Sequence, residues 1–215
     1  MAQTAAEGKS PARFTQAVSR GLREGAVILT GAAALMLFTA LASYSPEDPG
    51  FSFTGGGSEV SNLIGRGGAW IADVLYFLFG GPAYLFPLMI GAACWIMFRH
   101  RDDEQPVSRA NTLVRVGGFA LTLVGTCALA TLHWSTDSLR QSAGGVVGSL
   151  VGHSLLGNLN YLGATLLLLA ACMTGVSLAF GVSWFVVMDR IGAATWNAVD
   201  RLRVWRVARR DAAQG

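Results

Sequence analysis

The stretch GAVILTGAAALMLFTALASY, residues 25–44, runs for twenty residues without a charged side chain. A helix rises about 1.5 Å per residue, so this length covers the roughly 30 Å of a bilayer's hydrocarbon core. The rest of the chain has the same character. Of its 215 residues, 52% are hydrophobic and 13% charged, with a mean hydropathy of +0.45. Soluble domains carry about 25% charged residues, and disordered chains carry little hydrophobicity. The sequence therefore predicts an integral membrane protein.

Three further apolar runs cover residues 74–98, 113–132 and 159–188. Together with residues 25–44 they predict an all-α fold with four transmembrane helices. The last run is longer than one crossing requires, so we expect it to tilt or to project beyond the bilayer. The second is interrupted by residues that favour a kink or a discontinuous helix, because proline removes a backbone donor and clashes with the preceding turn; these residues are Gly80, Gly81, Pro82 and Pro87.

The positive charges indicate the orientation of these spans. Fourteen of the 16 Lys and Arg residues precede the first span, lie between the second and third, or follow the fourth. Such residues collect on the cytoplasmic side, so both termini are predicted to be cytoplasmic. We expect residues 1–20 to be a flexible N-terminus, residues 21–188 the membrane domain, and residues 189–215 a basic exit helix leading into a linker. A cleaved signal peptide ending near Ala42 is the weaker alternative, because its apolar segment would exceed the usual length.

Two segments outside the spans also show helical patterns. Between the third and fourth spans, residues 139–156 are predicted to form an interfacial or re-entrant helix. Its glycines recur every fourth residue and predict a helix-packing or oligomer contact: they are Gly144, Gly148 and Gly152. The exit helix carries arginines that we expect to contact phospholipid headgroups: they are Arg201, Arg203, Arg206, Arg209 and Arg210.

The sequence contains no recognisable catalytic, cofactor or metal constellation. The interiors of the apolar runs carry no charged residue, and the three histidines fall on opposite sides of the predicted membrane. Gly8-Lys9-Ser10 resembles the end of a P-loop, but the motif's first glycine position is Gln3. Asp73, at the start of the second run, is interpreted as a first-turn residue that favours the helix dipole. We therefore predict a chain without an active site.

Two strings before the second run carry a resemblance to a known family. Residues 44–50, YSPEDPG, and residues 67–75, GGAWIADVL, resemble the N-terminal four-helix membrane domain of the FtsK/SpoIIIE DNA translocases. The resemblance extends over roughly residues 20–200. It marks a candidate periplasmic partner site or structural motif made of Ser45, Pro46, Asp48, Pro49, Gly68, Trp70 and Asp73.

What this resemblance implies is a multi-pass inner-membrane protein at the division septum. It would anchor and assemble a translocase, and so couple cell division to chromosome segregation. The implied partners are membrane lipids, the divisome proteins FtsQ, FtsL and FtsB, FtsZ, and further copies of the chain, with a hexamer as the expected order. ATP, Mg and DNA would bind only a downstream motor. The alternative is a small channel or transporter that uses the broken second span.

Overall fold

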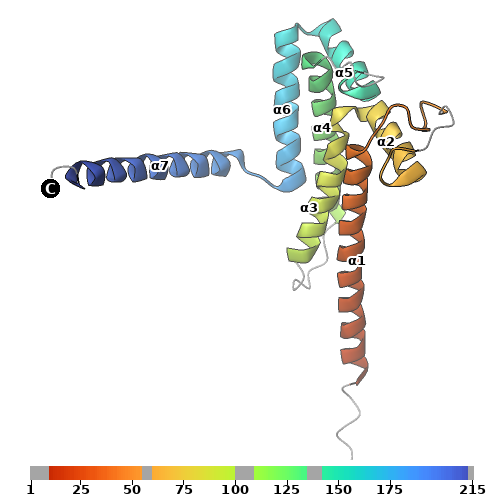
Figure 1. The fold of residues 1–215 in the computed structure, drawn as a ribbon, viewed down its shortest axis with the longest axis horizontal. Coiled ribbons are helices and arrows are strands. Elements are labelled where there is room, and N and C mark those ends of the chain that lie inside the picture. The colour runs from red at the N-terminus through yellow and green to blue at the C-terminus, as the bar shows by residue number, and fades with distance from the viewer. Residues whose placement is uncertain (1–9, 55–59, 100–108, 135–141, 213–215) are drawn as a thin grey trace, which may run out of the picture. The chain divides into compact units, whose positions relative to one another are not determined.

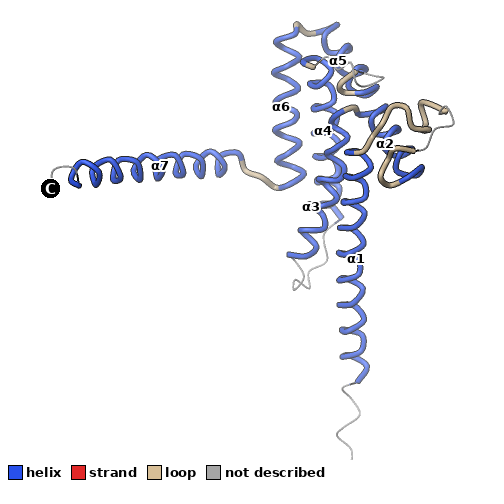
Figure 2. The backbone as a smooth tube through the Cα atoms, in the orientation of Figure 1, coloured by secondary structure: helices blue, strands red, loops and turns tan. Residues whose placement is uncertain are grey.

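The computed structural model describes residues 10–54, 60–99, 109–134 and 142–212. Within these ranges every regular element is helical, so the predicted all-helical class is confirmed (Figure 2). The elements, labelled in Figure 1, are α1 (Ser10–Ala42), α2 (Gly65–Phe79), the 3₁₀ helix η1 (Gly81–Tyr84), α3 (Leu85–Arg99), α4 (Arg109–His133), α5 (Gly145–Asn158), α6 (Tyr161–Phe180) and α7 (Trp184–Ala212). They form two compact units, one of residues 1–107 and 123–169 and the other of residues 108–122 and 170–215.

In the first unit, α1 lies along α3, and α2 packs against both α1 and α5 (Figure 1). A small core joins α1, α2 and η1 around Leu41, Ala72 and Ala83, all almost completely buried. Two of the three are alanines, and small side chains let helix backbones approach closely where lipid supplies little hydrophobic drive. The helix α1 begins at Ser10, so it includes part of the segment that we expected to be flexible.

The interruption expected within residues 74–98 is a break between two helices. The helix α2 ends at Phe79, Gly80 takes a left-handed backbone with φ +61°, and η1 then leads into α3. Pro82 stands in the first turn of η1 and Pro87 in the first turn of α3. The first turn of a helix has no internal acceptor for its N–H groups, so proline is tolerated there. The break is therefore at Gly80 and not at Pro87.

The second unit contains the first half of α4, the second half of α6 and all of α7. Glycines bring α4 and α6 together here, because a Cβ built at Gly175 would stand 2.7 Å from the carbonyl oxygen of Gly118. The run over residues 159–188, expected to form one long helix, is divided between two helices. The helix α6 ends at Phe180, Gly181 has φ +66°, and α7 is a separate helix.

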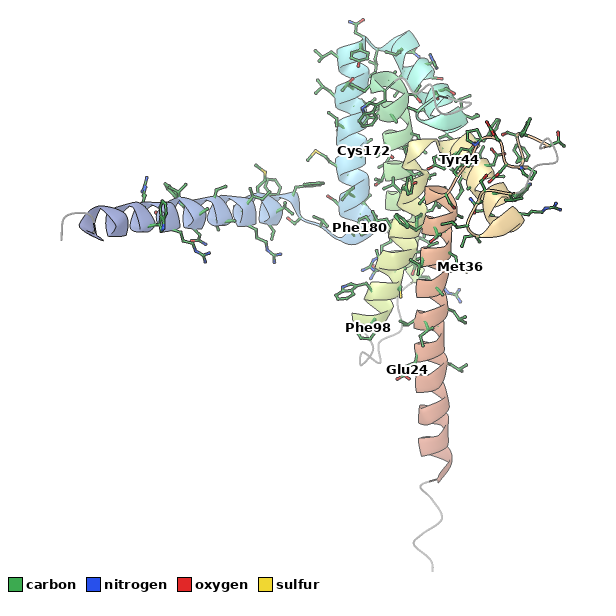
Figure 3. All side chains as sticks on the ribbon, viewed as in Figure 1. Glu24, Met36, Tyr44, Phe98, Cys172 and Phe180 are labelled. Atoms are coloured by element: carbon green, nitrogen blue, oxygen red, sulfur yellow. The ribbon has the colours of Figure 1, made fainter. Side chains whose placement is uncertain are left out.

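Three of the described helices are long and apolar enough to cross a membrane: residues 24–42 of α1, then α4 and α6. Residues 81–95, in η1 and α3, form a shorter apolar segment. Many large apolar side chains on these helices are exposed, as Figure 3 shows for the labelled Met36, Phe98 and Phe180. Such surfaces suit contact with lipid and not with water.

Candidate functional site

The segment between α1 and α2 forms a hydrogen-bonded cover, here called the loop cap and defined as residues 43–54 and 60–64. Its first fixed point is Asp73, a buried residue of α2. The Asp73 carboxylate accepts hydrogen bonds from the Tyr44 hydroxyl at 3.1 Å, the Ser52 N–H at 2.5 Å and the Ser52 hydroxyl at 2.8 Å. Gly50 lies so close to this carboxylate that no side chain fits there. Asp73 therefore fastens the loop cap to α2.

The predicted role of Asp73 as a first-turn residue is wrong. The helix α2 begins at Gly65, well before the expected start, and its first turn contains no acidic residue. Asp73 lies beyond the turn where the helix dipole acts. What stabilises its charge is the set of three donors, since a carboxylate removed from water needs hydrogen-bond partners.

The second fixed point is the pair Asp48 and Asn62, both buried. The Asp48 carboxylate accepts the backbone N–H groups of Ser61 at 2.8 Å and Asn62 at 2.9 Å. The Asn62 side-chain amide donates to the carbonyl of Ala40 at 2.8 Å, and its oxygen accepts the Ile64 N–H at 3.0 Å. Carbonyls in the last turn of a helix have no internal partner, so Asn62 satisfies one at the end of α1.

Gly68 belongs to the same arrangement, because a Cβ there would meet the Asn62 side-chain oxygen and the Ile64 side chain. Sequence reasoning singled out Gly68 and Asp48 but missed Asn62. No local pattern marks Asn62, since its partner Ala40 lies 22 positions earlier.

The remaining residues of the predicted motif have other places. The Ser45 carbonyl accepts the Asp48 N–H in a turn, at 3.2 Å. Pro46 and Pro49, in the same stretch, are partly buried. Trp70 differs, because it is 51% exposed and contacts only the ring of Phe51 among the ring pairs of the described residues, at 6.5 Å. The motif therefore divides into buried or partly buried residues that build or hold the loop cap and one exposed aromatic residue, Trp70.

The chemistry of the loop cap is structural. Within the described ranges, neither Asp48 nor Asp73 has an ion-pair partner, and no three His, Cys, Asp or Glu residues lie close enough to hold a metal. Both carboxylates are occupied by N–H and O–H donors from their own chain. Such an arrangement holds a surface in one shape and leaves no carboxylate oxygen poised for proton transfer.

A second site, here called the glycine junction, comprises Gly80, Gly81, Gly144, Gly145 and Gly148. The Gly81 N–H donates to the Ala143 carbonyl at 2.9 Å. A Cβ at Gly80 would overlap that same carbonyl, and one at Gly145, which has φ +64°, would overlap the backbone of Leu78. The backbone after α2 therefore touches the backbone before α5 with no side chain between them.

The predicted glycine row of α5 packs against α4 of the same chain. Cβ atoms at Gly144 and Gly148 would overlap the carbonyl oxygen of Cys127, and one at Gly152 would lie 3.5 Å from Leu132. The Cys127 thiol donates to the Phe79 carbonyl at 3.4 Å, which ties α4 to the glycine junction. This contact fits the helix-packing interpretation of the row. The oligomer interpretation lacks a free surface, because α4 occupies the row. The helix itself is α5, Gly145–Asn158, so it starts later than expected, although residues 139–141 lie outside the described part.

The basic exit helix is α7, whose described side chains are exposed except for the partly buried Trp184 and Val187. Arg203 pairs with Asp200 at 3.8 Å, and Arg201 is exposed. The side chains of Arg206, Arg209 and Arg210 lie outside the described part of the chain. A hydrogen bond fixes the start of α7, because the Trp184 indole donates to the Met173 carbonyl of α6 at 2.9 Å.

Comparison with known proteins bears on both sites. A sequence model of the 4TM region of DNA translocase FtsK/SpoIIIE matches residues 19–192. The DNA translocase FtsK of Shewanella oneidensis is 35% identical over 191 residues, which cover 88% of this chain and 21% of the relative. The proteins of that name from Vibrio vulnificus and Pseudomonas putida are 37% and 39% identical, covering 85% and 81% of this chain but 19% and 21% of their own lengths. No solved structure matches. The chain thus spans about a fifth of the length of these relatives.

Proposed function

Because the chain belongs to the family of the four-transmembrane region of the DNA translocases FtsK and SpoIIIE, we propose that it anchors and assembles such a translocase at the division septum. The matched region is the membrane region and not the ATPase motor. In this proposal the motor is cytoplasmic and pumps DNA, while the present residues hold it at the inner membrane. Cell division and chromosome segregation are coupled through this physical link.

The observation that carries the proposal is the exposed apolar surface of α1, α4 and α6, which spans the matched region. An anchor needs helices that face lipid, and it needs little else at membrane depth. The loop cap supports the assembly part, because a cover held by buried carboxylates presents one defined surface to partners such as FtsQ, FtsL and FtsB. Contacts with FtsZ and a hexameric assembly of the chain belong to the same proposal.

The four-span arrangement needs one crossing besides α1, α4 and α6, and we assign it to η1 together with α3. The 15 residues of α3 and the 4 residues of η1 rise about 22 Å and about 8 Å, and their sum is about the thickness of the hydrocarbon core. With four crossings and the asymmetry of Lys and Arg, both termini are cytoplasmic. The exit helix α7 then runs from the membrane with Arg201 and Arg203 near anionic headgroups, and its basic continuation, Arg206, Arg209 and Arg210, shares this role.

The channel alternative has no support from the break in the second run. A pore lined by carbonyls requires free carbonyl groups. Here the Phe79 carbonyl accepts the Cys127 thiol, and the space beside Gly80 is filled by the backbone of residues 143–145.

Localisation in cells tests the anchor proposal. A fluorescent fusion of residues 1–215 should gather at the septum without any motor attached. The Gly192→Ala variant is the matched control and should behave identically, because a Cβ there meets no atom within 4 Å. Even fluorescence around the whole envelope would contradict the assembly role.

Labelling of single cysteines with an impermeant thiol reagent tests the orientation. Glu47→Cys and Asn158→Cys, both at exposed positions, should react in intact cells. Arg109→Cys, also exposed, should react only after the membrane is opened. Reaction of position 109 in intact cells would overturn the four-span arrangement.

A further inference from the structure

The two faces of α2 differ in burial. One face is buried against the rest of its unit and contains Gly68, Ala69, Ala72 and Asp73. On the opposite face Trp70 is 51% and Ile71 46% exposed, whereas Val74, Phe77 and Leu78 are partly buried. Residues at spacings of three and four continue this face along the helix: they are Trp70, Ile71, Val74, Phe77 and Leu78.

From Trp70 to Leu78 this face carries no charge, and Arg66, four residues before Trp70, stands at its N-terminal end. The two charged residues of α2 are Arg66, in the first turn, and Asp73, which points into the loop cap and is held by three donors. A helix that is apolar on both sides is typical of a membrane or a protein core, and not of a surface in water. A contiguous apolar surface of this kind marks contact with lipid or with a partner.

Length decides how α2 can meet a bilayer. Its 15 residues rise about 22 Å, less than the roughly 30 Å of the hydrocarbon core. Its C-terminal end passes through Gly80 directly into η1 and α3, the segment whose apolar residues continue from Gly81 to Trp95. The C-terminal end of α2 is therefore joined to an apolar membrane segment, whereas Arg66 lies at the N-terminal end of the helix.

One aromatic ring of the loop cap contacts α2 at two positions along its length. The Phe51 ring of the loop cap contacts Trp70 at 6.5 Å and Phe77 at 5.7 Å, both edge to face. Phe51 is itself 59% exposed, so it enlarges the apolar face instead of covering it. Trp70 and Arg66 near the beginning of the helix are residue types that favour the boundary between headgroups and acyl chains.

From these observations we infer that α2 inserts part-way into the bilayer without crossing it, and that its face of Trp70, Ile71, Val74, Phe77 and Leu78 lies against lipid acyl chains. The loop cap then rests at the headgroup level, and Phe51 reaches into the interface. The occupant is lipid because the face is uncharged and continuous with a membrane segment. This inference depends on the membrane domain alone and holds whether or not the chain acts at the septum.

Photo-crosslinking in the full chain tests the inference directly. A photoreactive phenylalanine analogue is placed at Phe77 and, in a second variant, at Trp70, and the adducts are identified by mass spectrometry after irradiation of intact membranes. Phospholipid adducts are expected at both positions. The same analogue at Tyr76, whose ring packs against the rings of Tyr44 and Tyr84 on the other side of α2, is the control and should give no phospholipid adduct above background.

Two results would overturn the inference. The first is a protein adduct in place of lipid at Phe77 and Trp70, which would make this face a protein interface. The second is the absence of lipid adducts at both positions combined with reaction of Ile71→Cys with an impermeant thiol reagent, which would place the face in water. The near-isosteric change at Phe77 retains the ring against Phe51, so folding of at least one variant is preserved.

Discussion

Gly80 and Gly181 end helices with nearly the same φ, +61° and +66°, but in opposite surroundings. Gly80 is buried, and a Cβ there would overlap the Ala143 carbonyl. Gly181 is exposed, and a Cβ there would meet nothing within 4 Å. At the first break the backbone of another element packs against the glycine. At the second no atom lies near the Cβ position, and the chain only changes direction there.

The difference shows that two separate features can require glycine: a positive φ, and the close approach of another element. A left-handed backbone penalises any Cβ through the residue's own carbonyl, whatever surrounds it. A close approach penalises it through atoms of another element. Four substitutions by alanine separate the two effects, since the chain offers each combination of them.

Gly80 combines both features, so Gly80→Ala has the largest expected effect. Strain at positive φ and overlap with Ala143 together should lower the free energy of unfolding by about 2–5 kcal/mol. Denaturation of the full chain in mixed micelles, followed by tryptophan fluorescence, measures this. Gly81→Ala is the control, because its Cβ would make an ordinary contact of 3.8 Å with the Ala143 carbonyl at an ordinary φ. Equal losses in the two variants would contradict the close packing at Gly80.

Gly148→Ala isolates the close approach. Its backbone is helical, but a Cβ would overlap the Cys127 carbonyl of α4. We expect a loss of about 1–3 kcal/mol in the same denaturation experiment, from overpacking alone. Gly157→Ala, in the same helix but with open space around it, should be neutral or slightly stabilising. A Gly148→Ala variant as stable as Gly157→Ala would show that α5 does not pack on α4 through this row.

Gly181→Ala isolates the positive φ. The local cost is about 1–2 kcal/mol, and it is confined to the connection between α6 and α7. The expected result is altered amide hydrogen exchange near residues 180–184, with the denaturation midpoint of the first unit unchanged. A destabilisation as large as that of Gly80→Ala would mean that another element packs against the second break as well.

Gly192 has neither a positive φ nor a close neighbour. Gly192→Ala should therefore have the smallest effect, a slight stabilisation instead of a loss. It lies within α7 with no atom within 4 Å of its Cβ position. Alanine favours the helix by about 0.5–1 kcal/mol over glycine, so exchange of the α7 amides should slow. Faster exchange would indicate a neighbour at this position.

Sequence reasoning located one of these breaks and missed the other, for physical reasons. Gly80, Gly81 and Pro82 follow one another, and proline cannot continue a helix interior, so the interruption was evident. Gly181 has no proline or second glycine beside it, and an isolated glycine is tolerated within a helix at a cost of about 1 kcal/mol. Hydropathy alone therefore joined α6 to the beginning of α7.

The loop cap was predictable in part. The turn-forming prolines and the strings around Asp48 and Gly68 marked the region as distinctive. Most partners of its polar side chains could not be predicted, because most of these bonds join residues far apart in the chain, as for Tyr44 and Asp73, separated by 29 positions. Periodicity reports which residues share a helix face, but it contains no information about which loop carbonyl meets which side chain.

The bond from Asn62 to the Ala40 carbonyl imposes an order in time on biosynthesis. The acceptor is made 22 residues before its donor. At a synthesis rate of about 5–20 residues per second, the end of α1 waits roughly 1–4 s for Asn62. The Leu41 carbonyl differs, because it accepts the nearby Tyr44 N–H at 3.3 Å and the Tyr76 hydroxyl, 35 residues later, is its second donor. During this interval water must solvate the end of the nascent helix, so the first span of this chain is complete before the groups that close its end exist.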